Sequence, residues 1–393
     1  NKLMAMDTWF MQGGWGFLDA SEVDPLLDKM AEALETGADA VLAANARDME
    51  IGRGAGLNDT SLDRLLLDQE RLTGMAAGVR NVRVLPGPVG EEFDAATMPN
   101  GLVIARRRVP LGVIGAVYES RPNVTVDIAA LCLKSGNACI LRGGSEAIHS
   151  NTALATLVQN AIEAAGVPWE AIQFIQNTDR ALVSQMVRMR EYIDLLIPRG
   201  GADLVRFVAE HASMPAVTGG IGVCHTYVDK GADPDKAMRI VFNAKVRRPS
   251  ICNALDTLLI HAGEAPGLLP PLARQLGAAG VALHCDSRAM SLLGPVDEVQ
   301  ATPATDEDWG KEFLDLIMAV KVVGSLDEAL EHIERYGSGH SEAIVTENQA
   351  NGRRFLDDVD AAAVYLNAST QFTDGGQLGL GAEVGISTQK FHA

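Results

Sequence analysis

The sequence predicts an α/β protein with two parallel sheets, each covered by helices, in successive parts of the chain. From residue 113 onward, short apolar runs rich in Val and Ile alternate with segments of helical length. Strands buried on both faces and joined by helices are typical of parallel, doubly wound sheets. The chain has 393 residues, 47% of them hydrophobic. That suffices for two cores, since a single core stops growing at about 250–300 residues.

The part of the chain before these strands is predicted to be helical. From Ser21, a candidate N-cap, apolar residues recur at helical spacing as far as Leu34. A further helix is predicted from Thr60 to Val82 on the same pattern. Residues 102–108 alternate weakly and end in three arginines, so we expect an exposed strand or hairpin arm there.

The predicted strands fall into two sets, with a domain boundary near Tyr227. The first set comprises 113–118, 138–141, 172–175, 193–197 and 223–228, with helices at 151–165 and 202–210. The second set comprises 255–260, 281–284, 314–323, 343–345 and 362–366. Segment 294–311 is predicted to be a long surface loop.

The composition excludes several classes of protein. A net charge of −18 argues against a nucleic-acid partner or an anionic membrane surface. No apolar run reaches the ~20 residues that span a bilayer, and the start of the sequence lacks a signal-peptide pattern. Five widely spaced cysteines without a C-x-x-C pair indicate a reducing, cytoplasmic setting and neither a disulfide framework nor a zinc site.

Cys252 is the candidate nucleophile. It follows Pro249 and two arginines, Arg247 and Arg248, and it precedes a predicted strand. Nearby positive charge lowers the pKa of a thiol and raises the fraction of reactive thiolate. A buried structural cysteine is the commoner alternative, and this segment alone does not exclude it.

A second polar segment, residues 119–123, lies between a predicted strand and a predicted helix. Ligands of parallel α/β sheets bind at such turns. Asn123 offers an amide donor suited to an oxyanion, and Arg121 offers a bidentate clamp for a carboxylate or phosphate. A capping turn without a catalytic role is the alternative interpretation.

Two glycine pairs also follow predicted strands, each with an arginine before it. They are Arg142, Gly143 and Gly144, and Arg199, Gly200 and Gly201. Backbone N–H groups at such turns can bind phosphate, although an ordinary turn is the commoner explanation for either pair alone. Neither pair is a G-x-G-x-x-G fingerprint. Because an arginine suits a 2′-phosphate, the two turns together favour NADPH over NADH.

An ordered series of motifs resembles that of the gamma-glutamyl phosphate reductases, a branch of the aldehyde dehydrogenase superfamily. The resemblance runs from about Ala31 to the end of the chain. Its most specific stretches are 109–115, 120–127, 133–137, 140–144, 196–201, 218–225, 248–253, 367–370 and 381–390. So many matches in one order are hard to obtain by chance.

The resemblance implies a Rossmann-like cofactor domain, an α/β catalytic domain and a β-hairpin oligomerisation arm. We place the cofactor domain at residues 1–226, with the arm at about 97–110, and the catalytic domain at 227–366. Residues 367–393 are expected to return to the cofactor domain and the oligomerisation region. The resemblance further implies a homo-oligomer, a dimer or tetramer, and functional contact with glutamate 5-kinase.

The resemblance also implies roles for single residues. Cys252 matches the family's nucleophile and Asn123 the oxyanion asparagine. The implied cofactor is NADPH, with expected contacts at Lys134, Arg142, Gly143, Gly144, Arg199, Gly200, Gly201 and Glu312. Expected contacts of the substrate, L-glutamyl 5-phosphate, are Ser120, Arg121, Arg248, Ser369 and Thr370. No metal is expected.

The implied reaction reduces L-glutamyl 5-phosphate to L-glutamate 5-semialdehyde with release of phosphate, through a thioester on Cys252, in proline biosynthesis. Hydrolytic aldehyde dehydrogenases carry a glutamate in the segment matching Val217–Gly220, where it activates water. In this chain no acid occurs between His211 and Val228. A thioester that awaits reduction is thereby protected from hydrolysis.

Two features depart from the family pattern. Position 371 is Gln where the family has Arg, which bears on substrate or phosphate binding. The sequence also stops at Ala393, before the family's Arg-Gly-Pro-Met-Gly-like tail, which bears on the oligomer.

The first alternative function is another acylating dehydrogenase of the superfamily, for example a CoA-dependent one. The second is a catalytically silent binding homologue.

Overall fold

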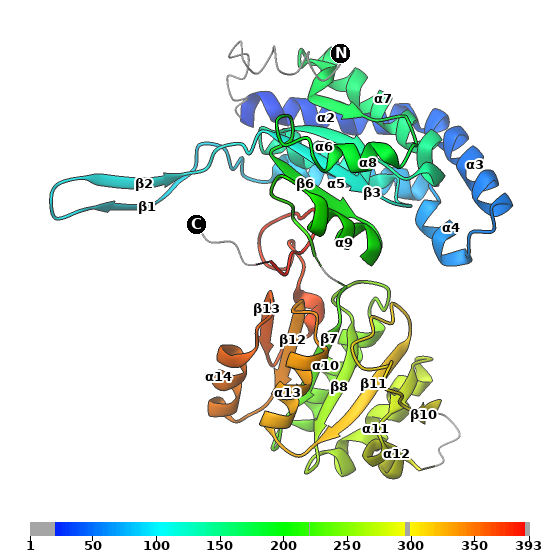
Figure 1. The fold of residues 1–393 in the computed structure, drawn as a ribbon, viewed down its shortest axis with the longest axis vertical. Coiled ribbons are helices and arrows are strands. Elements are labelled where there is room, and N and C mark those ends of the chain that lie inside the picture. The colour runs from blue at the N-terminus through cyan, green and yellow to red at the C-terminus, as the bar shows by residue number, and fades with distance from the viewer. Residues whose placement is uncertain (1–19, 220, 295–298, 390–393) are drawn as a thin grey trace. The chain divides into compact units, whose positions relative to one another are not determined.

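The computed structural model describes residues 20–219, 221–294 and 299–389 and divides into two compact units, residues 1–218 and 219–393 (Figure 1). Each unit contains a parallel sheet with covering helices, which confirms the predicted α/β class. The boundary lies before strand β7 (Cys224–Val228), whereas the sequence analysis placed it inside this strand. Because β7 pairs with β8 (Leu255–His261) and β12 (Ser341–Val345), all of β7 belongs to the second unit. Residues 367–393 also group with that unit.

Within the described residues, the first unit begins with the helices α2 (Ala20–Thr36), α3 (Ala38–Gly54), α4 (Asp59–Leu65) and α5 (Gln69–Val84). The predicted helix from Thr60 to Val82 is wrong in one respect, because it is two helices. Leu66 adopts an extended conformation, and the Asp68 carboxylate accepts from the Arg71 N–H at 2.8 Å to cap α5. This N-cap interrupts an apolar spacing that reads as continuous in the sequence.

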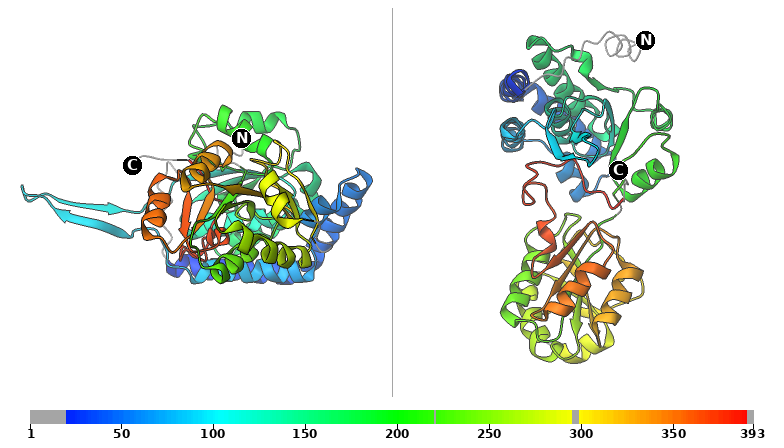
Figure 2. Two further views of the ribbon diagram at one scale, coloured as in Figure 1. Left: turned by 90° about the horizontal axis from the view of Figure 1, so that it is seen from below. Right: turned by 90° about the vertical axis from the view of Figure 1, so that its left-hand side faces the viewer.

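The sheet of the first unit has the order β5-β4-β3-β6, and all of its pairs are parallel. Its strands are β3 (Val113–Tyr118), β4 (Ala138–Arg142), β5 (Ile172–Phe174) and β6 (Leu195–Arg199). The helices that follow α5 are α6 (Asn123–Lys134), α7 (Ile148–Ala164), α8 (Ala181–Met186) and α9 (Ala202–His211), with short 3-10 turns at η1 (Ser145–Ala147) and η2 (Trp169–Ala171). Figure 2 shows helices on both sides of this sheet.

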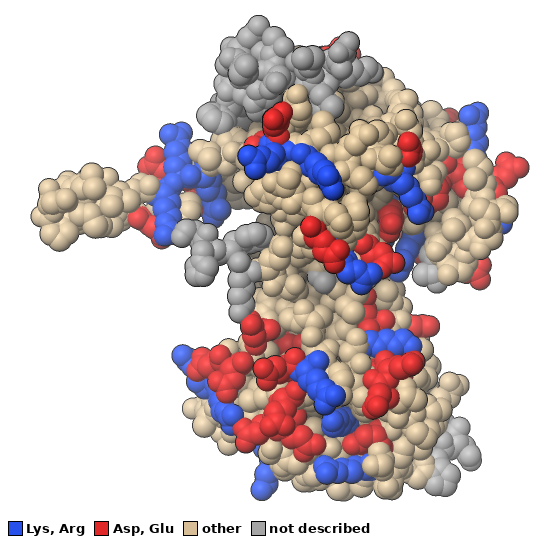
Figure 3. Space-filling model, viewed as in Figure 1, with Lys and Arg blue, Asp and Glu red and all other residues tan. Residues whose placement is uncertain are grey.

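An antiparallel hairpin, β1 (Glu92–Thr97) with β2 (Val103–Arg107), extends from the first unit (Figures 1 and 2). A hairpin arm was predicted, and the paired strands begin somewhat earlier in the chain than expected. Leu102, Val103 and Ile104 are large apolar residues that are exposed on it. Figure 3 shows charged side chains at the base of the hairpin and none at its tip.

The sheet of the second unit has seven parallel strands in the order β10-β9-β11-β8-β7-β12-β13. The strands not yet given are β9 (Ala282–Cys285), β10 (Ala301–Pro303), β11 (Ile317–Val323) and β13 (Ala363–Leu366). One apolar cluster packs α10 (Pro234–Val246), α11 (Ala265–Ala278) and α12 (Ser287–Leu293) on the sheet. A second cluster packs α13 (Leu326–Tyr336) and α14 (Gln349–Asp358) on it, and the 3-10 turn η3 (Thr370–Phe372) follows β13.

The segment 294–311, predicted to be a loop, includes the short strand β10, and residues 295–298 lie outside the described residues. Over the described ranges, no helix is both long and apolar enough to cross a membrane.

Candidate active site

Cys252 lies in the turn that joins α10 to β8, at the amino end of the strand. Its side chain is partly exposed, whereas the other four cysteines are buried. Burial raises the pKa of the thiols of Cys139, Cys224 and Cys285, which disfavours the reactive thiolate in each. Cys252 is therefore the cysteine whose surroundings allow contact with a substrate.

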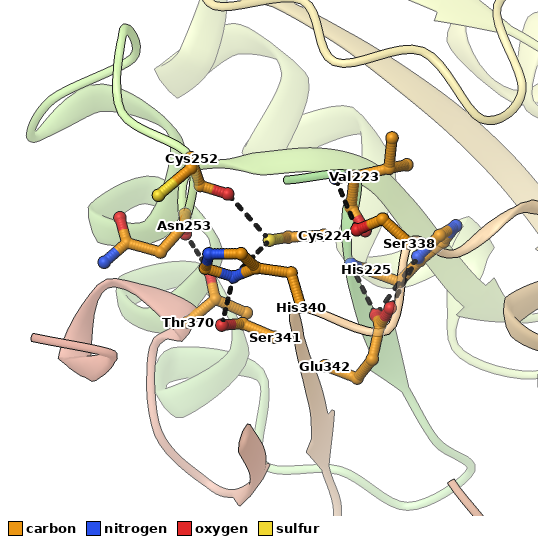
Figure 4. Close-up of polar contacts among 10 residues, drawn as sticks. All are labelled: Val223, Cys224, His225, Cys252, Asn253, Ser338, His340, Ser341, Glu342 and Thr370. Atoms are coloured by element: carbon orange, nitrogen blue, oxygen red, sulfur yellow. Dashed lines mark hydrogen bonds and ion pairs between the residues drawn. The ribbon is translucent and has the colours of Figure 1, made fainter. Parts of the chain in front are cut away.

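Polar contacts from neighbouring elements hold this turn (Figure 4). The Cys224 thiol, at the start of β7, donates to the carbonyl oxygen of Cys252 at 3.2 Å. The Thr370 hydroxyl in η3 donates to the carbonyl of Asn253 at 2.7 Å, and the Asn253 amide donates to the carbonyl of Thr373 at 2.9 Å. The main chain on the C-terminal side of Cys252 is thus tied to both β7 and η3.

Gly222 packs directly against the main chain of Cys252. A Cβ atom at position 222 would overlap the Cys252 carbonyl, so only glycine allows this approach. The Gly222 N–H donates to the Glu312 carboxylate at 2.9 Å. Although no acid occurs between His211 and Val228 in the sequence, a carboxylate from a distant segment does reach this stretch of chain.

The two residues of a buried ion pair flank Cys252 in the sequence. Lys245 in the last turn of α10 and Asp256 in β8 are both buried, with 3.8 Å between Nζ and Oδ1. Desolvation lowers the pKa of Lys245 to about 8 and raises the pKa of Asp256 to about 7. Asp256 also accepts from the Phe313 N–H at 3.1 Å, so the pair contacts the segment that carries Glu312.

In the first unit, the turn after β3 carries Ser120 and Asn123. Ser120 has a positive φ of 51°, a conformation that costs energy in a non-glycine residue and is concentrated at functional sites. Its N–H and hydroxyl both donate to Oε1 of Glu146, at 2.6 and 3.0 Å. Asn123 is the first residue of α6, and its amide donates to Oδ2 of Asp127 at 2.7 Å.

The two glycine turns lie at the same carboxyl edge of this sheet, after β4 and β6. The Gly201 N–H, a predicted phosphate donor, already donates to the Glu119 carboxylate at 2.9 Å. A Cβ atom at Gly200 would overlap Glu119, and one at Gly143 would overlap Asn151. The constraint is stricter at Gly143, because Asn151 is buried, whereas Glu119 is exposed and its side chain can move.

Arg142 and Arg199 lie at this edge, and Lys134 does not. The Arg142 guanidinium donates to the carbonyl of Thr178 at 3.0 Å, while its buried Nε meets no acceptor among the described residues. Burial lowers the pKa of Arg142. Lys134 ends α6 at the opposite edge and is buried, with its ammonium 2.7 Å from the carboxylate of Asp24. Its observed contacts are with Asp24 in α2 and the carbonyl of Arg83 in α5, and its place among the cofactor contacts stays a prediction.

The residues expected to contact the substrate differ in their exposure to solvent. Arg121 and Arg248 are exposed, whereas Ser369 and Thr370 are buried. Gln371 is buried as well, and its amide donates to the carbonyls of Ala244 at 3.0 Å and Arg248 at 3.3 Å. It satisfies carbonyl groups at the C-terminal end of α10, where a helix leaves acceptors without partners.

The sequence alone does not indicate the roles of Glu119 and Glu146, which accept from backbone N–H groups of the turns, or those of Asp127 and Gly222. Asp127 and Gly222 lie inside the quoted motifs, but no local pattern distinguishes their contacts. In the described part of the chain, no three His, Cys, Asp or Glu residues gather in an arrangement that could hold a metal ion.

Comparison with known proteins defines the class. The model of the aldehyde dehydrogenase family matches residues 7–297, so the chain belongs to the aldehyde dehydrogenase family. An acetylating aldehyde dehydrogenase from Geobacillus thermoglucosidasius shares the fold, with a TM-score of 0.63 over 96% of this chain and 88% of that chain at 17% identity.

Relatives of higher identity are reductases of one kind. The chain is 55% identical to the gamma-glutamyl phosphate reductase of Dehalococcoides mccartyi, over 96% of this chain and 89% of the relative. It is 50% identical to that of Escherichia coli, over 96% and 90%. The crystal structure of gamma-glutamyl phosphate reductase from Thermotoga maritima matches with a TM-score of 0.93 and 44% identity, over 100% and 94% of the chains. The predicted resemblance and the aldehyde dehydrogenase-like fold are confirmed.

Proposed function

We propose that the protein reduces L-glutamyl 5-phosphate to L-glutamate 5-semialdehyde with release of phosphate, as a step in proline biosynthesis. The observation that carries the proposal is the partly exposed Cys252 in a turn held by Cys224 and Thr370. The relatives named as gamma-glutamyl phosphate reductases, at 50–56% identity, support the substrate.

The chain's own residues perform the acyl transfer. The Cys252 thiolate attacks the acyl carbon, and the Asn123 amide with the Cys252 N–H stabilises the oxyanion that forms. When the oxyanion collapses, the C–O bond to phosphate breaks and a thioester remains. Phosphate is a good leaving group and needs little protonation. After reduction of the thioester carbonyl, the C–S bond breaks, the semialdehyde leaves and the Cys252 thiolate is regenerated.

The first unit is proposed to bind NADPH at the carboxyl edge of its sheet. When bound, the cofactor supplies the hydride. Arg142 and Arg199 fit an anionic ligand, because Arg142 has a buried Nε without an acceptor and Arg199 is exposed at the same edge. Glu119 accepts from the Gly201 N–H and Glu146 accepts from the Ser120 N–H, so we assign the main attraction for phosphate to the two arginines. Glu312 is proposed to reach the nicotinamide ribose.

Protection of the thioester from water depends on Glu312, since it is the carboxylate that reaches Gly222. One oxygen of the Glu312 carboxylate accepts a hydrogen bond from the Gly222 N–H at 2.9 Å. This hydrogen bond makes the carboxylate a weaker base, so it is less able to activate a water molecule. We expect reduction to exceed hydrolysis of the acyl-enzyme. Release of glutamate from the acyl-enzyme without cofactor, at a rate comparable with turnover, would contradict this part of the proposal.

The central test replaces the nucleophile. Cys252→Ala should abolish NADPH oxidation with L-glutamyl 5-phosphate while NADPH affinity stays unchanged in a fluorescence titration. Cys285→Ala is the matched control, because Cys285 is a buried thiol at the end of β9 in the same unit, and it should keep activity. Appreciable turnover by Cys252→Ala would overturn the assignment.

A second experiment separates acyl-phosphate from acyl-CoA chemistry. In the oxidative direction, NADP⁺ reduction with glutamate semialdehyde should require inorganic phosphate. A rate that requires CoA and ignores phosphate would replace the proposed substrate by an acyl thioester. No reaction with either acceptor would favour a silent binding protein.

A further inference from the structure

Asn123 has a charged partner on its own helix. Asp127 lies one turn further along α6, and its Oδ2 accepts from Nδ2 of Asn123 at 2.7 Å. An ionised carboxylate can only accept hydrogen bonds, so the amide nitrogen and not the amide oxygen must face Asp127. This contact removes the rotational ambiguity that an asparagine amide otherwise has.

We propose that Asp127 is a positioning residue, which fixes the amide of Asn123 in the orientation that stabilises the oxyanion of acyl transfer. The proposal rests on the proposed function and deepens it. An asparagine amide has two N–H groups, and the contact with Asp127 engages one of them. The other N–H then has a fixed direction and serves the substrate oxygen.

Loss of the carboxylate would release the amide. A rotated Asn123 would present its oxygen, which repels a developing negative charge and does not stabilise it. Stabilisation of an oxyanion requires donors whose orientation is fixed before the charge develops, because reorientation during the reaction consumes the benefit. The effect of Asp127 is therefore expected on the chemical step and not on substrate affinity.

A second charged group from another element acts on Asp127. Desolvation raises the pKa of the Asp127 carboxyl, while the Asn123 amide and the charge of Arg199, at the end of β6, act in the opposite direction. Arg199 thus favours the ionised, accept-only form on which the orientation of Asn123 depends. This gives the exposed Arg199 an electrostatic role at the turn in addition to any contact with a cofactor.

The test uses three substitutions in the full-length chain. Asp127→Ala removes the acceptor and should lower kcat for NADPH oxidation about 10- to 100-fold, less than the ~10²–10³-fold cost of deleting an oxyanion donor, with KM for L-glutamyl 5-phosphate unchanged. Asp127→Asn retains an acceptor oxygen and should recover kcat to within about threefold of wild type. Asp203→Ala, on the exposed surface of α9, is the control and should leave kcat unchanged.

A double-mutant cycle decides whether Asp127 acts through Asn123. In the Asn123→Ala background, Asp127→Ala should cause no further loss of kcat. A second, multiplied loss there, or a loss in Asp127→Ala that accompanies a lower urea midpoint, would overturn the positioning role. The two proposals can fail separately. If Asn123→Ala keeps full kcat, the assignment of Asn123 to the oxyanion is wrong. If Asn123→Ala has a low kcat but Asp127→Ala keeps full kcat, only the role of Asp127 is wrong.

Discussion

At the scale of single residues, the main chain of the nucleophile limits what its neighbours can be. The carbonyl oxygen of Cys252 accepts a hydrogen bond from the Cys224 thiol, and Gly222 packs against the same carbonyl group. Glu312 holds Gly222 in place through its N–H. The position of the sulfur therefore depends on a residue without a side chain and on a carboxylate 60 positions away from the nucleophile in the sequence.

Gly222→Ala should displace the nucleophile turn, because the added methyl group overlaps the Cys252 carbonyl. We expect kcat to fall by about 10²-fold, the loss that a displacement of about 1 Å produces. The free energy of unfolding should fall by about 1–3 kcal/mol from overpacking. Steady-state kinetics and urea denaturation measure both.

The control for this substitution is Gly267→Ala in α11. Gly267 is exposed in a helix and an added methyl group meets no atom within 4 Å. Alanine there should keep activity and raise stability by about 0.5–1 kcal/mol. An active Gly222→Ala variant would show that the turn does not need this close approach.

At this scale the sequence indicates the proposed reactive residues but not the residues that support them. Cys252 was recognisable from neighbouring arginines and its motif, and Asn123 from its strand-end turn. The contacts of Glu312 with Gly222 and of Glu146 with Ser120 join segments far apart in the chain, so no local spacing indicates them. Gln371 was expected to affect the substrate site, but it binds carbonyls at the end of α10, a role that depends on tertiary packing.

At the scale of elements, α10 and β8 share a buried ion pair on either side of the nucleophile turn. Removing two charges from water is costly, and their attraction repays this cost only with good geometry. The 3.8 Å separation of Lys245 and Asp256 is long for a strong pair, and the ammonium has no hydrogen-bond acceptor among the described residues. For this reason the pKa of Lys245 is lowered and the pKa of Asp256 is raised, and both shifts favour the neutral form of the group.

This pair predicts a pH-dependent stability. Asp256 has a pKa raised from 3.8 to about 7, so between these values the native state holds a proton that the unfolded chain has lost, and stability falls as pH rises. Lys245 has a pKa lowered from 10.5 to about 8, so between 8 and 10.5 only the unfolded chain holds the proton, and stability rises with pH.

The double variant Lys245→Met with Asp256→Asn removes both titrations and keeps an acceptor for the Phe313 N–H. The unfolding free energy of the wild type minus that of the variant should decrease from pH 5 to 7 and increase from pH 8.5 to 10. Urea denaturation at constant ionic strength measures this difference. Parallel curves for the two proteins would show that the pair does not titrate in this range.

Most strands were predictable because buried parallel strands are short and continuously apolar. β3 lies where it was predicted, and β4, β7 and β8 deviate by a residue at one end. Errors occurred where a polar residue overrides the apolar pattern, as at the Asp68 cap between α4 and α5. The strand β10 was missed because three residues with a proline do not stand out from a loop.

At the scale of the whole molecule, the hairpin of β1 and β2 carries apolar residues that do not pack into the core of the first unit. Its apolar residues Leu102, Val103 and Ile104 are exposed. The sequence from Ala95 to Ala105 contains no charged residue to discourage edge pairing. We propose that the hairpin binds a second copy of the chain.

Val103→Ser with Ile104→Ser should lower the molar mass measured by light scattering after size-exclusion chromatography. The melting temperature of the subunit fold should not fall, because neither side chain is part of the buried core. Ile51→Ser, at an exposed isoleucine of α3 outside the hairpin, is the control and should keep the oligomer. An unchanged mass in the double variant would exclude the hairpin as the contact.

The nucleophile turn has a further consequence for the molecule as a whole. Cys224 begins β7, Ser341 begins β12 and hydrogen-bonds Thr373, and the turn itself leads into β8. These three strands are neighbours in the middle of a seven-stranded sheet. The turn is therefore connected to central strands of the sheet by side-chain hydrogen bonds. Thermal inactivation should coincide with melting of this sheet, so the upper working temperature of the enzyme is set by strand pairing and not by a fragile active-site loop.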